Sequence, residues 1–163
     1  MSALASRRIW LSVLTAAALG AATVPASAGP FSGLEGAWSG SGQISLENGA
    51  KERIRCRANY SVGNGGNTLQ QSLRCASDSY NFELRSDVES HDGRISGNWV
   101  ESTRNVGGTL SGSARHGRIE VSVESPSFNA ALTLSSHGNR QSVTIRSSGG
   151  QLTGASITLE RRG

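Results

Sequence analysis

Residues 54–75 read IRCRANYSVGNGGNTLQQSLRC, and this stretch decides the fold. Apolar and polar residues alternate on both sides of the central sequence GNGGN at positions 63–67. Such alternation is typical of strands with one face buried and one in water, and a run of glycine and asparagine is typical of the tight turn between them. The stretch therefore predicts an antiparallel β-hairpin.

The register of this hairpin predicts a disulfide. If Val62 faces Leu69 across the turn, then Cys56 faces Cys75, and both cysteines lie on the apolar face. Directly opposite residues of an antiparallel pair are close enough for a disulfide. The chain has no other cysteines, and their spacing is far from the Cys-x-x-Cys of redox catalysts. We therefore predict one structural, cross-strand disulfide.

The same period of two continues along the rest of the chain, punctuated by turn dipeptides such as Asn48-Gly49 and Asp92-Gly93. No window after residue 28 has the periodicity of a helix. The fold class that follows is all-β: a single antiparallel up-and-down meander of about ten strands. The strands are expected over or around residues 38–46, 54–62, 69–75, 80–84, 95–99, 110–112, 119–123, 128–134, 143–145 and 157–159.

Ten one-sided strands must bury their apolar faces against each other. Closing the meander into a barrel buries that face and removes both sheet edges. A two-sheet sandwich is the alternative, because the strand number alone does not separate the two. The alternation slips between Leu152 and Ile157, which predicts a β-bulge near Gly154 and Ala155.

The first 28 residues have the parts of a secretory signal peptide. Arg7 and Arg8 precede a short apolar run, and small residues stand at Ala26 and Ala28. We expect a signal peptide over residues 1–28, a β-barrel domain over residues 29–163 and a periplasmic or extracellular location. No later stretch approaches the roughly 20 apolar residues of a membrane helix, so no transmembrane segment is predicted after cleavage.

The charge balance does not favour a nucleic-acid partner. Sixteen basic residues stand against twelve acidic ones, giving a net charge of +4, and two of the basic residues belong to the leader. The aromatic residues share the parity of the apolar face, whereas single-stranded nucleic acid requires exposed aromatic side chains between the basic ones. We predict no nucleic-acid binding.

The segment LEGAWSGSG at residues 34–42 resembles the first strand of calycin-like barrels, the group of lipocalins, fatty-acid-binding proteins and avidins. Gly36 and Trp38 match the Gly-x-Trp of that strand. In many of those families a late arginine packs over the tryptophan, and here Arg161 or Arg162 would take that place. The resemblance implies a barrel that binds an apolar ligand, and it implies no catalysis.

No catalytic motif is present in the sequence: there is no nucleophile elbow, HExxH or phosphate loop. We therefore predict a protein that is not an enzyme, with no catalytic residues and no cofactor. The histidines at positions 91, 116 and 137 all fall in turns at one end of the meander. With Asp92 they could hold a metal, but alternate loops of a barrel stand roughly 10 Å apart. We therefore predict polar turn residues and no metal site.

The predicted function is binding of an apolar or amphipathic small molecule inside the barrel. Inward aromatic side chains give rigid apolar contact, and Gln71 opposite Tyr60 gives a polar group to orient the ligand. Inward glycines and alanines, such as Gly40, Gly42 and Ala130, are expected to leave unfilled space. The alternative is a core filled at normal density. The candidate ligand-binding residues are Trp38, Tyr60, Gln71, Tyr80, Phe82, Trp99 and Phe128.

A second candidate site is a basic patch on the outer face. The hairpin register places Arg57 opposite Arg74, and like charges in that arrangement are destabilising unless an anion or a carboxylate lies between them. The patch would bind an anionic surface or an envelope protein, as an inhibitor or assembly module does. Alternatively, Glu52 and Glu83 neutralise it. Its members are Arg53, Arg55, Arg57, Arg74 and Arg85.

Overall fold

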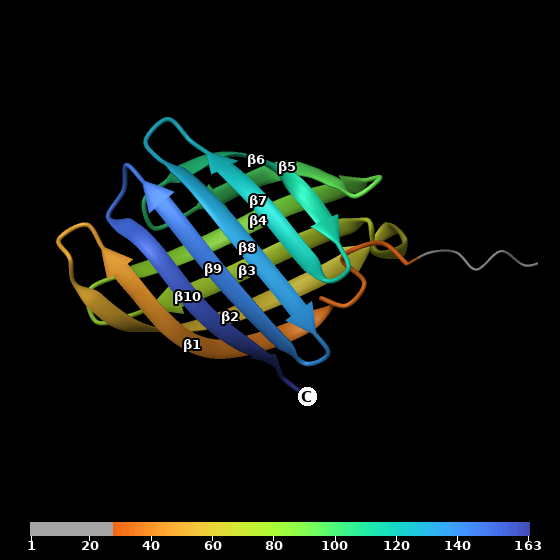
Figure 1. Cartoon of the computed structure of the whole chain (residues 1–163), viewed down its shortest axis with the longest axis horizontal. Helices are drawn as coiled ribbons and strands as arrows, with labels where there is room; N and C mark the ends of the chain where they lie inside the picture. Colours follow the sequence, from red (N-terminus) through yellow and green to blue (C-terminus); the bar gives the residue numbers. More distant parts are fainter. Residues whose placement is uncertain (1–27) are drawn as a thin grey trace, which may run out of the picture.

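The computed structural model describes residues 28–163, which form a closed barrel of ten antiparallel strands in sequential order (Figure 1). The fold class predicted from the sequence is confirmed, and closure of the sheet rules out the sandwich alternative. A short 3₁₀ turn, η1 (Asn64–Gly66), joins the second strand to the third. The strands are β1 (Gly36–Leu46), β2 (Lys51–Gly63), β3 (Thr68–Ala76), β4 (Asn81–His91), β5 (Arg94–Glu101), β6 (Val106–Arg115), β7 (Arg118–Glu124), β8 (Asn129–His137), β9 (Arg140–Ser148) and β10 (Leu152–Arg161).

The two ends of the barrel differ. We call the end that carries the β1–β2, β3–β4, β5–β6, β7–β8 and β9–β10 connections the open end, at the left of Figure 1. The other end carries η1 and the first residues of the described chain, and we call it the closed end. There Phe31 is fully buried and Leu34 is only 3% exposed. This N-terminal segment plugs the closed end with apolar side chains.

The hairpin register agrees with the sequence prediction. Cys56 pairs with Cys75, and Val62 pairs with Leu69. The two cysteines form a disulfide, with Cα atoms 4.2 Å apart. Because the pleat alternates strictly, this register also points Arg57 and Arg74 outward as a facing pair.

Strand β1 closes the barrel by pairing with β10, and two inward glycines allow a close approach. A Cβ atom at Gly40 would lie 1.9 Å from the carbonyl oxygen of Thr158, and one at Gly42 would lie 2.0 Å from that of Ser156. The register shifts where Ser45 pairs with Gly154 and Leu46 with Leu152, so that the extra residue is Thr153. The predicted irregularity thus occurs one residue before Gly154.

The predicted signal peptide lies outside the described residues, apart from Ala28. Within residues 28–163, no helix is long and apolar enough to cross a membrane.

Candidate functional site

The barrel encloses an apolar cavity of about 240 Å³. Its wall runs from Phe31 and Leu34 at the closed end to Tyr80, Arg104 and Gln151 in connections at the open end. The side chains at the closed end are buried, whereas Arg104 and Gln151 are exposed. The cavity therefore reaches solvent at the open end and is sealed at the other.

Six of the seven candidate ligand-binding residues line this cavity. Trp99 packs against Phe128 with ring centroids 5.4 Å apart, and these two rings form an aromatic wall on β5 and the β7–β8 connection. The six lining residues are Tyr60, Gln71, Tyr80, Phe82, Trp99 and Phe128.

Trp38 lies elsewhere. It is 1% exposed and is not among the residues that line the cavity. Its indole Nε1 donates a hydrogen bond of 2.8 Å to the carbonyl of Leu34, and its ring and that of Tyr60 are nearly perpendicular, with centroids 6.5 Å apart. The N-terminal segment covers Trp38, so its place is in the plug at the closed end.

The expectation about small residues needs correction. Gly40 and Gly42 do not line the cavity, because carbonyl oxygens of β10 occupy the space where their side chains would be. Among the inward alanines, Ala130 does line it, whereas Ala58 and Ala114 do not. Missing side chains at Gly40 and Gly42 thus do not account for the free volume.

Uncharged polar groups line the deeper half of the cavity. The Ser86 hydroxyl donates to Oε1 of Gln71 at 3.1 Å, and both residues contribute to the wall. Close by, the Tyr60 hydroxyl donates to Oε1 of Gln141 at 3.2 Å. Gln141 is fully buried, and its Nε2 has no hydrogen-bond partner among the described residues. Tyr60, Gln71 and Ser86 can orient a polar atom of a ligand, but they carry no charge, and Gln141 lies behind the wall that Tyr60 forms.

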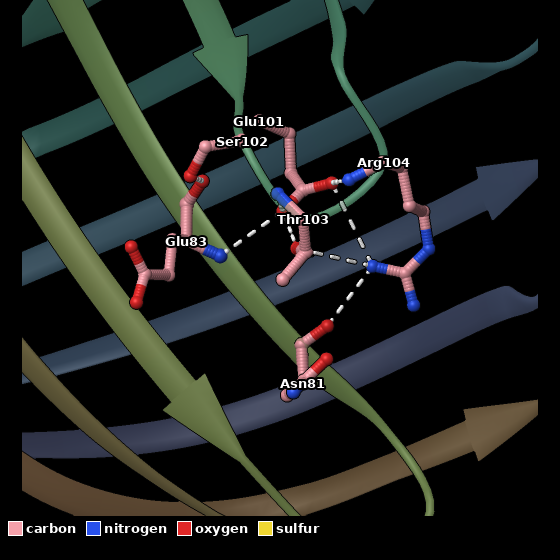
Figure 2. Close-up of polar contacts among 6 residues, drawn as sticks. All are labelled: Asn81, Glu83, Glu101, Ser102, Thr103 and Arg104. Carbon is pink, nitrogen blue, oxygen red and sulfur yellow. Dashed lines mark hydrogen bonds and ion pairs between the residues drawn. The ribbon is translucent and has the colours of Figure 1, made fainter.

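The only charged residues of the described chain that line the cavity are Glu101 and Arg104, at the open end. Glu101 is 6% exposed, and its carboxylate accepts hydrogen bonds from the backbone N–H groups of Glu83, Thr103 and Arg104 and from the Thr103 hydroxyl. Figure 2 shows how this carboxylate ties the β5–β6 connection to β4.

The guanidinium of Arg104 is held from three sides. Its Nη1 donates to the carbonyl of Asn81 at 2.9 Å and lies 3.6 Å from Oε2 of Glu101 (Figure 2). Its central carbon lies 4.3 Å from the centroid of the Tyr80 ring. We did not anticipate either charged residue from the sequence. Its place in the alternating pattern does mark Glu101 as inward, because it continues the series of Ile95, Gly97 and Trp99.

Burial raises the pKa of both tyrosines. Desolvation raises the pKa of Tyr60 far above its usual value, and it also raises that of Tyr80, where the nearby Arg104 opposes the shift. Both hydroxyls therefore stay protonated, and act as neutral hydrogen-bonding groups, to a higher pH than an exposed tyrosine does.

The basic patch lies on the outer faces of β2, β3 and β4, where all five arginines are exposed. Arg74 forms an ion pair of 3.3 Å with Glu83, which partly neutralises the patch. Glu52 does not contribute, since its carboxylate accepts hydrogen bonds from Ser77 and Ser79. These bonds, above all that from the Ser77 hydroxyl, lower the pKa of Glu52.

The three histidines lie at the closed end, in or beside the β4–β5, β6–β7 and β8–β9 turns. The structure brings no group of three or more histidine, cysteine, aspartate or glutamate residues together in a metal-binding arrangement within the described chain. His91 lies 3.8 Å from a carboxylate oxygen of its strand neighbour Glu89.

No protein-family model matches the sequence, and no curated protein matches it. Solved structures do share its fold. Rv2717c from M. tuberculosis superposes with a TM-score of 0.61 at 13% identity, covering 81% of this chain and 94% of that protein. The S-type phycobiliprotein lyase CPES from Guillardia theta superposes with a TM-score of 0.58 at 10% identity, covering 82% and 90%. The ten-strand barrel and these neighbours fit a calycin-like barrel fold, and identities this low establish the fold alone.

Proposed function

We propose that the barrel binds an apolar or amphipathic small molecule in its interior. The observation that carries this proposal is the cavity of about 240 Å³, lined by aromatic and aliphatic side chains and reaching solvent at one end. A dry apolar cavity of about 150 Å³ is enough to bind benzene, whereas pockets for drug-sized ligands start at about 300 Å³. The cavity volume thus suits a ligand larger than benzene and smaller than a drug-sized molecule, such as one with a medium-length alkyl chain.

Our proposal is for binding without catalysis. Within the described chain, no histidine, lysine or aspartate lines the cavity. The Glu101 carboxylate is occupied by the backbone of its own connection, which leaves it poorly placed to act as a general base. One structural neighbour is a lyase, so the test of binding includes mass spectrometry of the recovered ligand, which should be chemically unchanged.

The experiment is a calorimetric titration with 1-decanol, an uncharged apolar probe. Ala130 lines the cavity and its chain neighbour Ala131 points outward. Ala130→Phe should fill part of the cavity and weaken binding at least tenfold, while the matched control Ala131→Phe should bind within twofold of the wild type. Ala130→Leu adds a smaller side chain to the cavity and should give an intermediate loss of affinity. Absence of saturable binding by the wild type, or equal affinities for all variants, would contradict the proposal.

We further propose that the protein is exported. A disulfide such as Cys56–Cys75 is compatible with an oxidising compartment, and the expected signal peptide points to the same location. Intact-mass analysis of the protein from a fractionated cell envelope should find a chain that begins at Gly29. Retention of residues 1–28 in that fraction would contradict export with cleavage.

A second candidate function rests on the basic patch. Arg53, Arg55 and Arg57 follow one another along the outer face of β2, and all three are exposed. Such a row favours an anionic surface or an acidic face of an envelope protein. Co-sedimentation with anionic but not zwitterionic vesicles, lost when the three arginines are replaced by glutamine, would support this candidate.

A further inference from the structure

The charged groups of the cavity wall are confined to the open end, and this decides where an ionic group of a ligand can bind. All the other polar side chains of the wall are neutral: Tyr60, Gln71, Tyr80, Ser86, Ser147 and Gln151. Moving an isolated anion into an apolar environment without a counter-charge is very costly. An anionic group therefore cannot be bound deep in this barrel.

At the open end, by contrast, the positively charged side chain of Arg104 is held in position. Arg104 is fixed by the Asn81 carbonyl and the Tyr80 ring, which are neighbours where β4 begins, and by the Glu101 carboxylate at the end of β5. All the polar contacts of this guanidinium within the described residues use Nη1. The edge formed by Nε and Nη2 is therefore free, and such an edge binds a carboxylate through two parallel hydrogen bonds.

The neighbouring carboxylate does not compete for the same ligand atoms. Glu101 already accepts hydrogen bonds from three backbone N–H groups and the Thr103 hydroxyl. The Glu101 side chain is only 8% exposed, whereas that of Arg104 is 36% exposed. Figure 2 shows the contacts that hold both groups. The arrangement presents a donor edge to an incoming anion.

We infer that the ligand is an amphipathic acid, whose apolar part fills the cavity and whose carboxylate or similar anionic group binds the Nε–Nη2 edge of Arg104. This inference rests on the proposed binding function and specifies the ligand class of that same cavity. The orientation is tail-first, with the chain directed toward the closed end.

Decanoate and 1-decanol test this inference, because they share an alkyl chain and differ in the head group. The wild type should bind decanoate at least tenfold more tightly than 1-decanol at neutral pH. Arg104→Gln should lose this preference while its affinity for 1-decanol changes less than twofold. The control Arg146→Gln, which removes an exposed outward arginine of β9 that belongs to neither candidate site, should alter neither affinity.

Two further measurements separate a direct contact from the loss of charge beside Glu101. Arg104→Lys keeps the positive charge but lacks the planar edge, so it should retain only part of the preference for decanoate. In the wild type, the NMR signal of the Arg104 Nε–H should shift with decanoate and not with 1-decanol.

Three outcomes would overturn the inference: equal affinity of wild type and Arg104→Gln for decanoate, an unshifted Nε–H signal, or a larger loss of decanoate binding in Gln71→Leu than in Arg104→Gln. The last would mean that the head group binds deep in the barrel. If 1-decanol binds and decanoate shows no dependence on Arg104, this inference alone fails. If neither ligand binds, the proposed function itself fails.

Discussion

The guanidinium of Arg161 lies 4.4 Å from the centroid of the Trp38 ring, so that the last strand closes over the first. The same guanidinium donates hydrogen bonds to the carbonyls of Gly33 and Glu35 in the N-terminal segment. Trp38 in turn donates to the carbonyl of Leu34. One side chain thus joins both ends of the barrel chain and holds the apolar plug at the closed end.

Arg161→Met should therefore lower the free energy of unfolding by about 2 kcal/mol, since it removes a cation–π contact and two charge-assisted hydrogen bonds. Chemical denaturation measures this loss. Arg162→Met is the matched control, because the neighbouring Arg162 is exposed and its replacement should cost less than about 0.5 kcal/mol. Equal losses at the two positions would show that Arg161 does not hold the plug.

The Cys56–Cys75 disulfide should stabilise the protein by lowering the conformational entropy of the unfolded chain. Their sequence separation of 19 residues corresponds to about 3 kcal/mol in the loop-entropy model. The double replacement by alanine should lower the thermal midpoint, as should reduction of the wild type, and the oxidised protein should show no free thiol. Equal thermal midpoints for oxidised and reduced protein would contradict a stabilising bridge.

The buried hydrogen bond between Tyr60 and Gln141 should appear as coupling between two substitutions. Tyr60→Phe and Gln141→Leu each leave a buried polar atom without its partner, which costs about 1–3 kcal/mol. The double variant removes both atoms, so its loss should be smaller than the sum of the single losses by at least about 0.5 kcal/mol. Additive losses in denaturation experiments would mean that the two side chains do not interact.

The tyrosines should make stability fall in alkali. Burial raises the pKa of Tyr60 and Tyr80 in the folded state, so the folded chain holds these protons more tightly than the unfolded chain. Their contribution is fully present below the unfolded pKa of about 10 and is lost as the pH rises toward the folded value. The free energy of unfolding should fall above pH 10, with a slope of at most about 1.4 kcal/mol per pH unit for Tyr60.

Tyr60→Phe should flatten this dependence, and the chain has only one other tyrosine to maintain it. An identical alkaline slope in Tyr60→Phe and the wild type would show that Tyr60 does not titrate between the folded and unfolded states in the stated direction.

Most of the barrel was predictable because its rules are local. Strict alternation along each strand, together with the position of one turn, fixes which residues face each other, as Cys56 and Cys75 do. The same alternation places Trp99 and Phe128 inside. The resemblance of the first strand to calycin-like barrels also anticipated an arginine over Trp38, which is Arg161 and not Arg162.

Two of the features that the sequence did not predict, the plug and the close contact of β1 with β10, depend on parts of the chain that meet only after closure. Phe31 and Leu34 precede the alternating pattern, so nothing local marks them as the plug that takes Trp38 away from the cavity. Arg104 and Tyr80 lie just beyond the end of the β4–β5 hairpin at which Leu84 pairs with Glu101, and their contact depends on the paths of the two connections and not on strand alternation. The glycines of β1 mark close contact with β10 and not empty space.

The most direct test of the central claim is to locate a bound apolar molecule by NMR. Trp99 faces the cavity, and its neighbour Val100 points outward with 53% exposure. In a complex with 1-decanol, the alkyl protons should show nuclear Overhauser contacts to the rings of Trp99 and Phe128 and none to the Val100 methyl groups. Contacts to Val100 alone, or no contacts to Trp99 and Phe128 at saturating ligand, would contradict binding inside the barrel.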